Sequence, residues 1–187
     1  MKPILIDFPY EFETERLHIR YPLPGDGTAV HQAIQSSIEE LKPWMPFAQS
    51  EQKLDDVEAN IRESHADFLK RTDLRLLLFN KNSGSLIGSS GLHRIDWTLR
   101  KFEIGYWIDS RYSGEGFMSE AVRGISDFAF DHLEAKRVEI RCNKDNFRSR
   151  KVAERVNFDL EAILRNDSLS INGGELIDTC VYAKITK

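Results

Sequence analysis

The chain has 187 residues, a length typical of one domain. Hydrophobic residues make up 41% of it, enough to bury a core, which argues against a wholly disordered chain. The formal net charge is −4. No apolar run approaches the roughly 20 residues that span a bilayer. We therefore expect neither a membrane nor a nucleic-acid polymer as a direct partner.

Several short features indicate a cytoplasmic location. The apolar N-terminal run is soon interrupted by Asp7 and is too short for a signal peptide. Cys142 and Cys180 lie in apolar, strand-like segments and form no C-x-x-C pair, so we expect buried, reduced thiols. The five histidines lack metal-ligand spacing, so no metal is expected.

The first half of the chain predicts a strand, two helical regions and a meander. Alternating residues predict a strand at 17–21, followed by a Pro- and Gly-rich break. Asp26 is placed to cap a helix that begins near Gly27. Apolar residues at helical spacing predict a helix near 54–69. Three short apolar runs then predict an antiparallel meander over 74–79, 86–96 and 102–108.

The second half alternates helices with strands. The pattern predicts helices at about 115–133 and 147–157 and strands at 137–142, 158–164 and 176–185. The strand–helix–strand unit from 102 to 142 predicts a parallel pair with a right-handed crossover. Together these elements indicate one mixed α/β, or α+β, domain.

The most informative segment is the loop after the third meander strand, which holds Gly114 and Gly116 before a helix. Such a loop aims backbone N–H groups and a helix N-terminus at one point, and suits a phosphate or pyrophosphate. A dinucleotide-binding fingerprint would need a third glycine where Ser119 stands, and no P-loop sequence is present. A plain strand–helix connection is the remaining alternative.

The segment Arg111-x-x-Gly114-x-Gly116 resembles the signature of the GNAT superfamily of N-acetyltransferases. The order of predicted elements is similar over about residues 13–185. Further similarities point to the branch that acetylates the N-termini of ribosomal proteins. They are the segments 12–17, 41–47, 88–93 and 103–108, the pattern Asp145-Asn146-x-x-Ser149, and Asn157-Phe158.

The resemblance implies a single domain over 1–187 with a GNAT-like acyl-CoA N-acyltransferase fold. This fold is a mixed seven-stranded sheet flanked by helices, with splayed central parallel strands. Its cofactor is acetyl-CoA, with the pantetheine arm between 104–109 and 138–143 and in contact with Ile108. The pyrophosphate would bind backbone N–H groups of Arg111, Tyr112, Ser113, Gly114, Glu115, Gly116, Phe117 and Met118.

Polar residues at the thiol end and a basic segment complete the implied cofactor site. Asn143, Asn146 and Ser149 are placed toward the thiol end. Residues 136–155 hold eight basic and three acidic residues, a net charge of +5, so the rest of the chain carries −9. A local basic segment suits a small anionic ligand. The candidates for the CoA phosphates are Arg148, Arg150, Lys151 and Arg155.

The chemistry requires a base, an oxyanion donor and an acid. Glu103 is the first candidate base, because it alternates with apolar strand neighbours and faces the other side of the sheet. His93 is the second. Ser149 matches the position thought to protonate the leaving thiolate in relatives, and a backbone N–H near Tyr106–Ile108 would hold the oxyanion.

Two departures from the family pattern affect these expectations. Asn157 stands where the family usually has glycine, and asparagine is the next best residue in a left-handed conformation. Ser168 stands where some relatives have a glutamate proposed as the base. The base is therefore expected to be Glu103, His93, Asp167 or water.

Trp44, Phe47 and Trp107 are candidates for the acceptor groove. The expected reaction is direct attack, in a ternary complex, of a primary amine on acetyl-CoA. We expect a protein N-terminal α-amine as the acceptor. The alternatives are a small amine (a polyamine, an amino acid or an antibiotic) and a non-catalytic acyl-CoA-binding module. Members of this branch are often homodimers.

Overall fold

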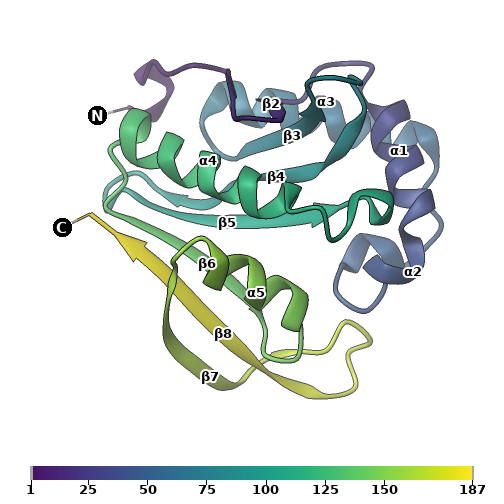
Figure 1. The fold of residues 1–187 in the computed structure, drawn as a ribbon, viewed down its shortest axis with the longest axis vertical. Helices are drawn as coiled ribbons and strands as arrows, with labels where there is room; N and C mark the ends of the chain where they lie inside the picture. Colours follow the sequence, from purple (N-terminus) through teal and green to yellow (C-terminus); the bar gives the residue numbers. More distant parts are fainter. Residues whose placement is uncertain (1, 187) are drawn as a thin grey trace.

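The computed structural model describes residues 2–186, whose strands form one sheet in the order β1-β2-β3-β4-β5-β6-β8-β7 (Figure 1). The strands are β1 (Glu11–Glu13), β2 (Leu17–Arg20), β3 (Leu74–Asn80), β4 (Leu86–Asp96), β5 (Lys101–Ile108), β6 (Arg137–Asn143), β7 (Asp159–Leu169) and β8 (Leu176–Ile185). The α-helices are α1 (Gly27–Ser36), α2 (Ile38–Leu41), α3 (Leu54–Lys70), α4 (Phe117–Leu133) and α5 (Phe147–Arg155). Three 3₁₀ turns cover Pro3–Leu5, Pro46–Gln49 and Ser110–Tyr112.

The mixed, helix-flanked fold is confirmed, but the sheet has eight strands and the predicted number of seven was wrong. The additional strand is β1, which pairs with β2 in antiparallel register, Glu11 opposite Arg20. A segment of three residues is too short to show an alternating pattern, so only the pairing with β2 identifies it.

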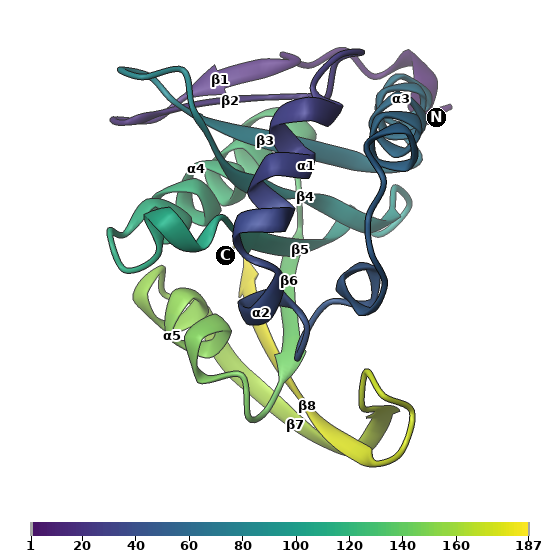
Figure 2. The same cartoon turned by 90° about the vertical axis from the view of Figure 1, so that its right-hand side faces the viewer.

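Helices cover both faces of the sheet. One core lies between the sheet and α4 with α5; Val122 and Ile125 of α4 pack there with Phe102 and Ile104 of β5. The second core lies under α1 and α3 and is centred on Ile61. Figure 2 shows α4 and α5 on the left and α3 on the right of the strands. In β3 and β4, neighbouring side chains point into different cores (Leu77 into the second, Leu76 and Leu78 into the first), because the side-chain period of a strand is two residues.

The pairing of the central strands is as the sequence predicts. β3, β4 and β5 form an antiparallel meander, and β5 pairs with β6 in parallel. The parallel pairing covers only Lys101–Glu103 opposite Arg137–Glu139. Beyond it the two strands diverge, toward the right in Figure 1.

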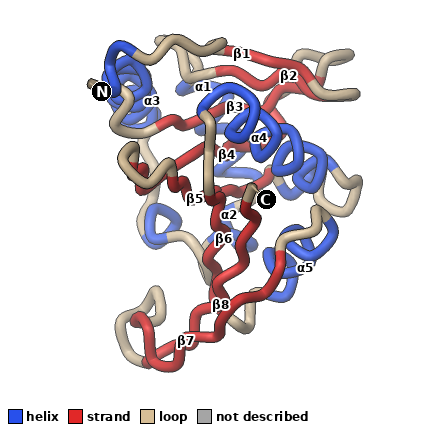
Figure 3. The backbone as a smooth tube through the Cα atoms, turned by 90° about the vertical axis from the view of Figure 1, so that its left-hand side faces the viewer, coloured by secondary structure: helices blue, strands red, loops and turns tan. Residues whose placement is uncertain are grey.

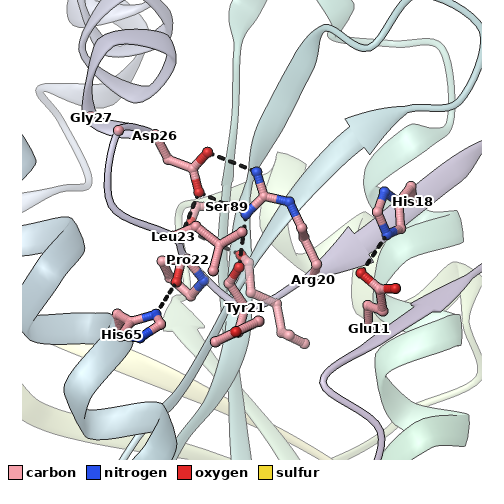
Figure 4. A network of polar contacts seen from close by, with 12 residues as sticks. Glu11, His18, Arg20, Tyr21, Pro22, Leu23, Asp26, Gly27, His65 and Ser89 are labelled. Carbon is pink, nitrogen blue, oxygen red and sulfur yellow. Dashed lines mark hydrogen bonds and ion pairs between the residues drawn. The ribbon is translucent and has the colours of Figure 1, made fainter.

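The predicted helix cap at the start of α1 was wrong. Asp26 precedes the helix, but its side chain makes no capping hydrogen bond to the helix. Its carboxylate instead accepts from both Arg20 Nη atoms, each at 2.7 Å, and from the Leu23 amide at 2.7 Å (Figure 4). His65 of α3 contacts the Pro22 carbonyl oxygen in the same network, with its Nδ1 at 2.8 Å. The carboxylate therefore fixes the turn between β2 and α1.

The C-terminal hairpin β7–β8 extends beyond the other strands at the lower left of Figure 3. Asn157, just before it, has φ 60°, which confirms the predicted left-handed residue. Cys142 and Cys180 lie opposite each other on β6 and β8, and both are free thiols. Cys180 is buried as predicted, whereas Cys142 is half-buried. None of the helices in residues 2–186 is long and apolar enough to cross a membrane.

Candidate functional site

A cleft of about 1230 Å³ opens where β5 and β6 separate. β5 continues to Ile108 after its last pair with β6, while β6 continues to Asn143 in register with β8. The edges of β5 and β6 beyond Glu103 and Glu139 are therefore left without pairing to each other. Of the predicted site residues, the cleft is lined by Trp44, Glu103, Trp107, Ile108, Ser113, Gly114, Gly116, Met118, Asn143, Asn146, Ser149 and Lys151.

The loop that carries the signature contributes Ser113, Gly114 and Gly116 to the lining of this cleft. Gly114 and Gly116 have φ 88° and 83°, a left-handed conformation that favours glycine. A Cβ added to Gly114 would meet nothing within 4 Å, so the loop is open at that point. Within residues 2–186 no side chain caps the N-terminus of α4. The loop therefore presents unused N–H groups beside the partial positive charge of a helix.

The first three predicted N–H donors are already used inside the turn. Arg111 N donates to Asp109 Oδ1 at 3.0 Å, Tyr112 N to the Asp109 carbonyl at 2.9 Å, and Ser113 N to the Ser110 carbonyl at 3.1 Å. The amides of 114–118 have no hydrogen-bond acceptor within the described chain. Of the predicted backbone donors, only the amides of Gly114–Met118 are thus left free within the described residues.

The Arg111 side chain stabilises the loop through hydrogen bonds to Asp109. Its Nε lies 3.0 Å from Asp109 Oδ2, and Asp109 is fully buried. Burial acts to raise the pKa of Asp109, but hydrogen bonds from Arg111 outweigh burial and lower the pKa below its usual value. Asp109 is therefore held as a carboxylate, and Arg111 is engaged with it.

A second support comes from the turn between β1 and β2. Glu120, in the first turn of α4, accepts from Thr14 Oγ1 at 2.6 Å, from Arg16 N at 2.7 Å and from Arg16 Nε at 2.6 Å. The Arg16 guanidinium also lies over the Phe117 ring, 4.2 Å from its centroid. These contacts fix the start of α4, which follows the loop of Gly114 and Gly116.

Two hydroxyl groups meet inside the cleft. Ser149 Oγ donates to Tyr106 Oη at 3.0 Å, and Tyr106 Oη donates to the Ser149 carbonyl at 2.9 Å. Asn146 Oδ1 accepts from Ser149 N at 3.1 Å and so caps α5 as an N-cap residue. Burial raises the pKa of Tyr106, so its hydroxyl stays protonated. Tyr106 was not among the predicted catalytic residues, although it lies two residues from both Ile104 and Ile108 and so shares their face of β5.

Glu103 lies at the point where β5 and β6 begin to separate, and it lines the cleft. Its side chain is 17% exposed, and the Arg94 Nη1 atom lies 3.5 Å from its carboxylate. Burial raises the pKa of Glu103, while the charges of Arg94 and Arg141 partly offset this effect. A carboxylate with a raised pKa is suited to accept a proton.

His93 lies opposite Glu103 on β4 but lines a different cavity. Its Nδ1 lies 2.7 Å from Asp73 Oδ2. The ring passes close to Gly91 and Gly105, where an added Cβ would lie 3.1 Å from ring atoms. The two glycines therefore provide the space in which the imidazole lies.

Asp167 and Ser168 lie on β7 and line the cleft. Arg141 Nη2 donates to Asp167 Oδ2 at 2.8 Å. Arg141 thus engages Asp167, whereas Glu103, whose pKa burial raises, lies where β5 and β6 begin to separate.

Half of the eight basic residues of the segment 136–155 are engaged with other side chains; they include Arg141, which pairs with Asp167. Arg137 pairs with Glu161, Lys144 with Asp178, and Arg150 Nε donates to Tyr182 Oη at 3.1 Å. Three cations line the cleft and form no ion pair within the described residues; they are Arg148, Lys151 and Arg155. Of the four predicted phosphate ligands, these three remain available and Arg150 does not line the cleft.

Aromatic residues also line the cleft. Trp44 and Trp107 line it, together with Met45. Phe47 lines the second cavity, and its ring centroid lies 6.1 Å from that of Trp107. The predicted acceptor aromatics thus gather around Trp107, on the face of β5 that carries Glu103.

A family comparison agrees with this geometry. The profile described as "Acetyltransferase (GNAT) domain" matches residues 16–159. This chain belongs to the GNAT acetyltransferase family. Its fold and its enzyme class are therefore established, and enzymes of this family use acetyl-CoA as the acetyl donor.

Named relatives indicate the branch. The chain is 35% identical over 163 residues to YdaF of Bacillus subtilis (strain 168), which carries a ribosomal N-acetyltransferase name, covering 85% of this chain and 86% of that protein. It is 29% identical over 143 residues to the ribosomal-protein-serine acetyltransferase of Escherichia coli (strain K12), covering 76% and 75%. These relatives support the ribosomal N-acetyltransferase branch.

Solved structures share the fold. RimL, a ribosomal L7/L12 alpha-N-protein acetyltransferase in complex with coenzyme A, matches with a TM-score of 0.84 and 22% identity over 92% of this chain and 95% of that one. The microcin C7 self-immunity acetyltransferase MccE, in complex with acetyl-CoA and AMP, matches with the same TM-score of 0.84 and 22% identity, over 92% and 94%.

Proposed function

We propose that this GNAT enzyme transfers the acetyl group of acetyl-CoA to the α-amine of a protein N-terminus, of the ribosomal-protein type. The observation that carries this proposal is the cleft between β5 and β6, with Glu103 at its closed end and the Tyr106–Ser149 hydroxyl pair on its wall. The names of the relatives support the class of acceptor. Acetyl-CoA and newly made proteins meet in the cytoplasm, which is the location we propose.

The cofactor would bind along the cleft from the loop to the hydroxyl pair. Gly114–Met118 supply the free amides for the pyrophosphate, and Arg148, Lys151 and Arg155 supply positive charge for the phosphates. The unpaired edge of β5 at Ile108 would bind the pantetheine amides as a neighbouring strand does. Acetyl-CoA when bound supplies the thioester carbonyl that the amine attacks.

Glu103 is the proposed base, acting directly or through one water. The α-amine has a pKa of about 7.7–8.0, so part of it is already neutral near pH 7 and a weak base is sufficient. The attacking nitrogen loses its proton toward Glu103. A β5 backbone N–H in Tyr106–Ile108 is the proposed oxyanion donor, and collapse of the tetrahedral adduct expels the thiolate.

Ser149 and Tyr106 are proposed to protonate that thiolate. Ser149 Oγ donates to Tyr106 Oη in this structure, and Tyr106 is held neutral by burial. Either hydroxyl can donate its proton to the thiolate while taking up a proton from water, and it keeps the other hydroxyl as a hydrogen-bond partner. The thiol pKa of about 8.5 makes this a modest demand.

Two measurements test the proposal. Thermal shift with CoA, acetyl-CoA and ATP tests the cofactor class, because a ligand at 100 times its Kd should stabilise the fold by about 2.7 kcal/mol. Stabilisation by ATP and not by CoA would contradict it. Release of free thiol is then followed with N-terminal peptides of ribosomal proteins, with polyamines, and with amino acids.

The acceptor panel separates the alternatives. Turnover that depends on the N-terminal residue of a peptide supports the proposed acceptor. Turnover of polyamines or antibiotics alone would assign a small-amine acetyltransferase, and CoA binding with no turnover of any amine would assign a non-catalytic module. His93, which lines the neighbouring cavity, remains the second candidate base.

A further inference from the structure

A second cavity of about 480 Å³ lies under α1 and α3, on the face of the sheet that carries His93. It adjoins the cofactor cleft, because Met45, Gly105, Tyr106 and Trp107 line both. Its walls include apolar residues of the helices, Val30, Ile34 and Val57. Its polar lining residues include Asn60 of α3, Arg75 of β3, and Ser89 and Ser90 of β4.

Arg75 is the unusual member of this lining. Its Nε donates to Ser89 Oγ at 3.1 Å, and its Nη1 donates to Asn60 Oδ1 at 2.6 Å and to Ser64 Oγ at 3.3 Å. All three acceptors are neutral. No carboxylate of residues 2–186 lies within 4.0 Å of its guanidinium nitrogens. Nη2 makes no hydrogen bond within the described chain, so one edge of the fork is available.

The nearby carboxylates do not neutralise this charge. Asp73 acts on Arg75 at longer range, but its Oδ2 is hydrogen-bonded to His93. Asp56 lines the cavity and is exposed, so water screens it. Burial lowers the pKa of Arg75, and the charge of Asp73 only partly offsets this effect. A guanidinium in a partly dry site without a close anion is costly unless a ligand supplies one.

We propose that this cavity binds a carboxylate of the amine acceptor through Arg75. The proposal rests on the proposed function, since the cavity meets the cleft along Gly105–Trp107, beside the amine site. A carboxylate would bind the open edge of the guanidinium, with Nη2 of Arg75 as its donor. The apolar wall would cover the aliphatic arm that carries the carboxylate.

Two acceptors can supply this group. One is a peptide with Asp or Glu at the second or third position. The other is an amino acid, whose own carboxylate lies close to its amine. The test must therefore vary the side-chain carboxylate and the α-carboxylate separately.

The first arm compares Ala-Glu-Ala-amide and Ala-Ala-Glu-amide with the same peptides carrying Gln. For one of the two positions, the wild-type kcat/KM for the Glu peptide should exceed that for its Gln counterpart by about tenfold or more. A hydrogen bond to a charged group is worth that factor. The second arm measures binding of N-acetylalanine and N-acetylalaninamide by calorimetry with CoA present. Acetylation removes the amine, whose own pKa would otherwise differ between the two ligands.

Arg75→Gln should abolish the preference in the arm that shows it. Arg75→Lys keeps the charge without the planar fork and should show a reduced preference for the acidic ligand. It takes the place of the glutamine variant if that variant does not fold. Arg62→Gln is the matched control, because Arg62 is an exposed α3 cation paired with Glu58 and does not line the cavity. It should retain the wild-type preference.

Equal activity with the Glu and Gln peptides, together with equal binding of the acid and the amide, would overturn the carboxylate site. Turnover of the peptides in that case would still support the proposed function. A preference that survives Arg75→Gln would also overturn it. If no amine is acetylated, the N-acetylated Glu and Gln peptides are compared by calorimetry. Arg75-dependent binding of the Glu form would then support the site and contradict the proposed reaction alone.

Discussion

Ser149 Oγ of α5 donates a hydrogen bond to the Tyr106 hydroxyl of β5 at 3.0 Å, inside the cleft where β5 and β6 separate. The contact joins the helix after β6 to the strand before α4. It places two potential proton donors on one wall of the cleft.

The hydroxyl pair predicts a loss of turnover without a loss of cofactor binding. Ser149→Ala should lower kcat by about tenfold or more, because the thiolate would lose its proposed donor. Tyr106→Phe should lower kcat as well. The Kd for acetyl-CoA should change little in both variants, as measured by calorimetry. Unchanged kcat in both would exclude this role.

Glu103 predicts an acidic limb in the pH–rate profile. Burial raises its pKa, so kcat at saturating amine should fall as the pH drops through a value above that of an ordinary glutamate. Glu103→Gln should remove this limb and lower kcat by about a hundredfold. A limb that persists in the variant would assign the base elsewhere, with His93→Gln as the next variant to measure.

Glu103→Gln should lower activity but should not lower the stability of the fold. A raised pKa in the folded state means that the folded protein binds the proton more tightly, so stability falls as the pH rises through the window between the unfolded and folded pKa values. Glu103→Gln should therefore match or exceed the wild-type Tm at pH 7. A marked loss of Tm would show that the Arg94 contact dominates instead.

Glu120 predicts coupling between stability and cofactor affinity. Glu120→Gln weakens three hydrogen bonds to Thr14 and Arg16 and should cost about 2 kcal/mol of unfolding free energy. The Kd for CoA should rise, because the start of α4 follows the anion-binding loop. Burial opposes ionisation of Glu120, but its hydrogen bonds lower the pKa below the usual value. The advantage of wild type over the variant should therefore shrink as the pH falls through that lowered pKa.

Lys151 predicts an electrostatic contribution to cofactor binding. Lys151→Gln should raise the Kd for acetyl-CoA about threefold to tenfold, because this cation lines the cleft without an ion pair in the described part of the chain. Lys144→Gln is the matched control, since Lys144 is paired with Asp178. Equal effects of the two substitutions would contradict the assignment.

Asn157 predicts a stabilising substitution. Its φ of 60° is left-handed, and glycine adopts this conformation without a Cβ penalty. Asn157→Gly should hold or raise stability by up to about 1 kcal/mol, and Asn157→Val should lower it by about 1–2 kcal/mol. Denaturant unfolding measures both. Destabilisation by glycine would show that the asparagine side chain has a role of its own.

Local patterns were sufficient for the meander, the parallel β5–β6 unit and the glycine loop. Each depends on features near in sequence, such as alternation along β5 or two glycines before α4. β1 was missed because three residues carry no periodic signal. The Asp26 side chain was misassigned because a capping residue can be captured by a stronger partner, here Arg20.

The sequence by itself determined the family-like order of elements, the position of the anion-binding loop and the placement of Glu103 on its own face of β5. Only the tertiary structure decided which polar groups remain available. Three loop amides are used inside their turn, Arg150 is engaged by Tyr182, and Arg75 is left without a close carboxylate. The physical reason is that hydrogen-bond partners come from segments distant in sequence. Their distances, and hence the free donors and charges of a site, exist only after the chain has folded.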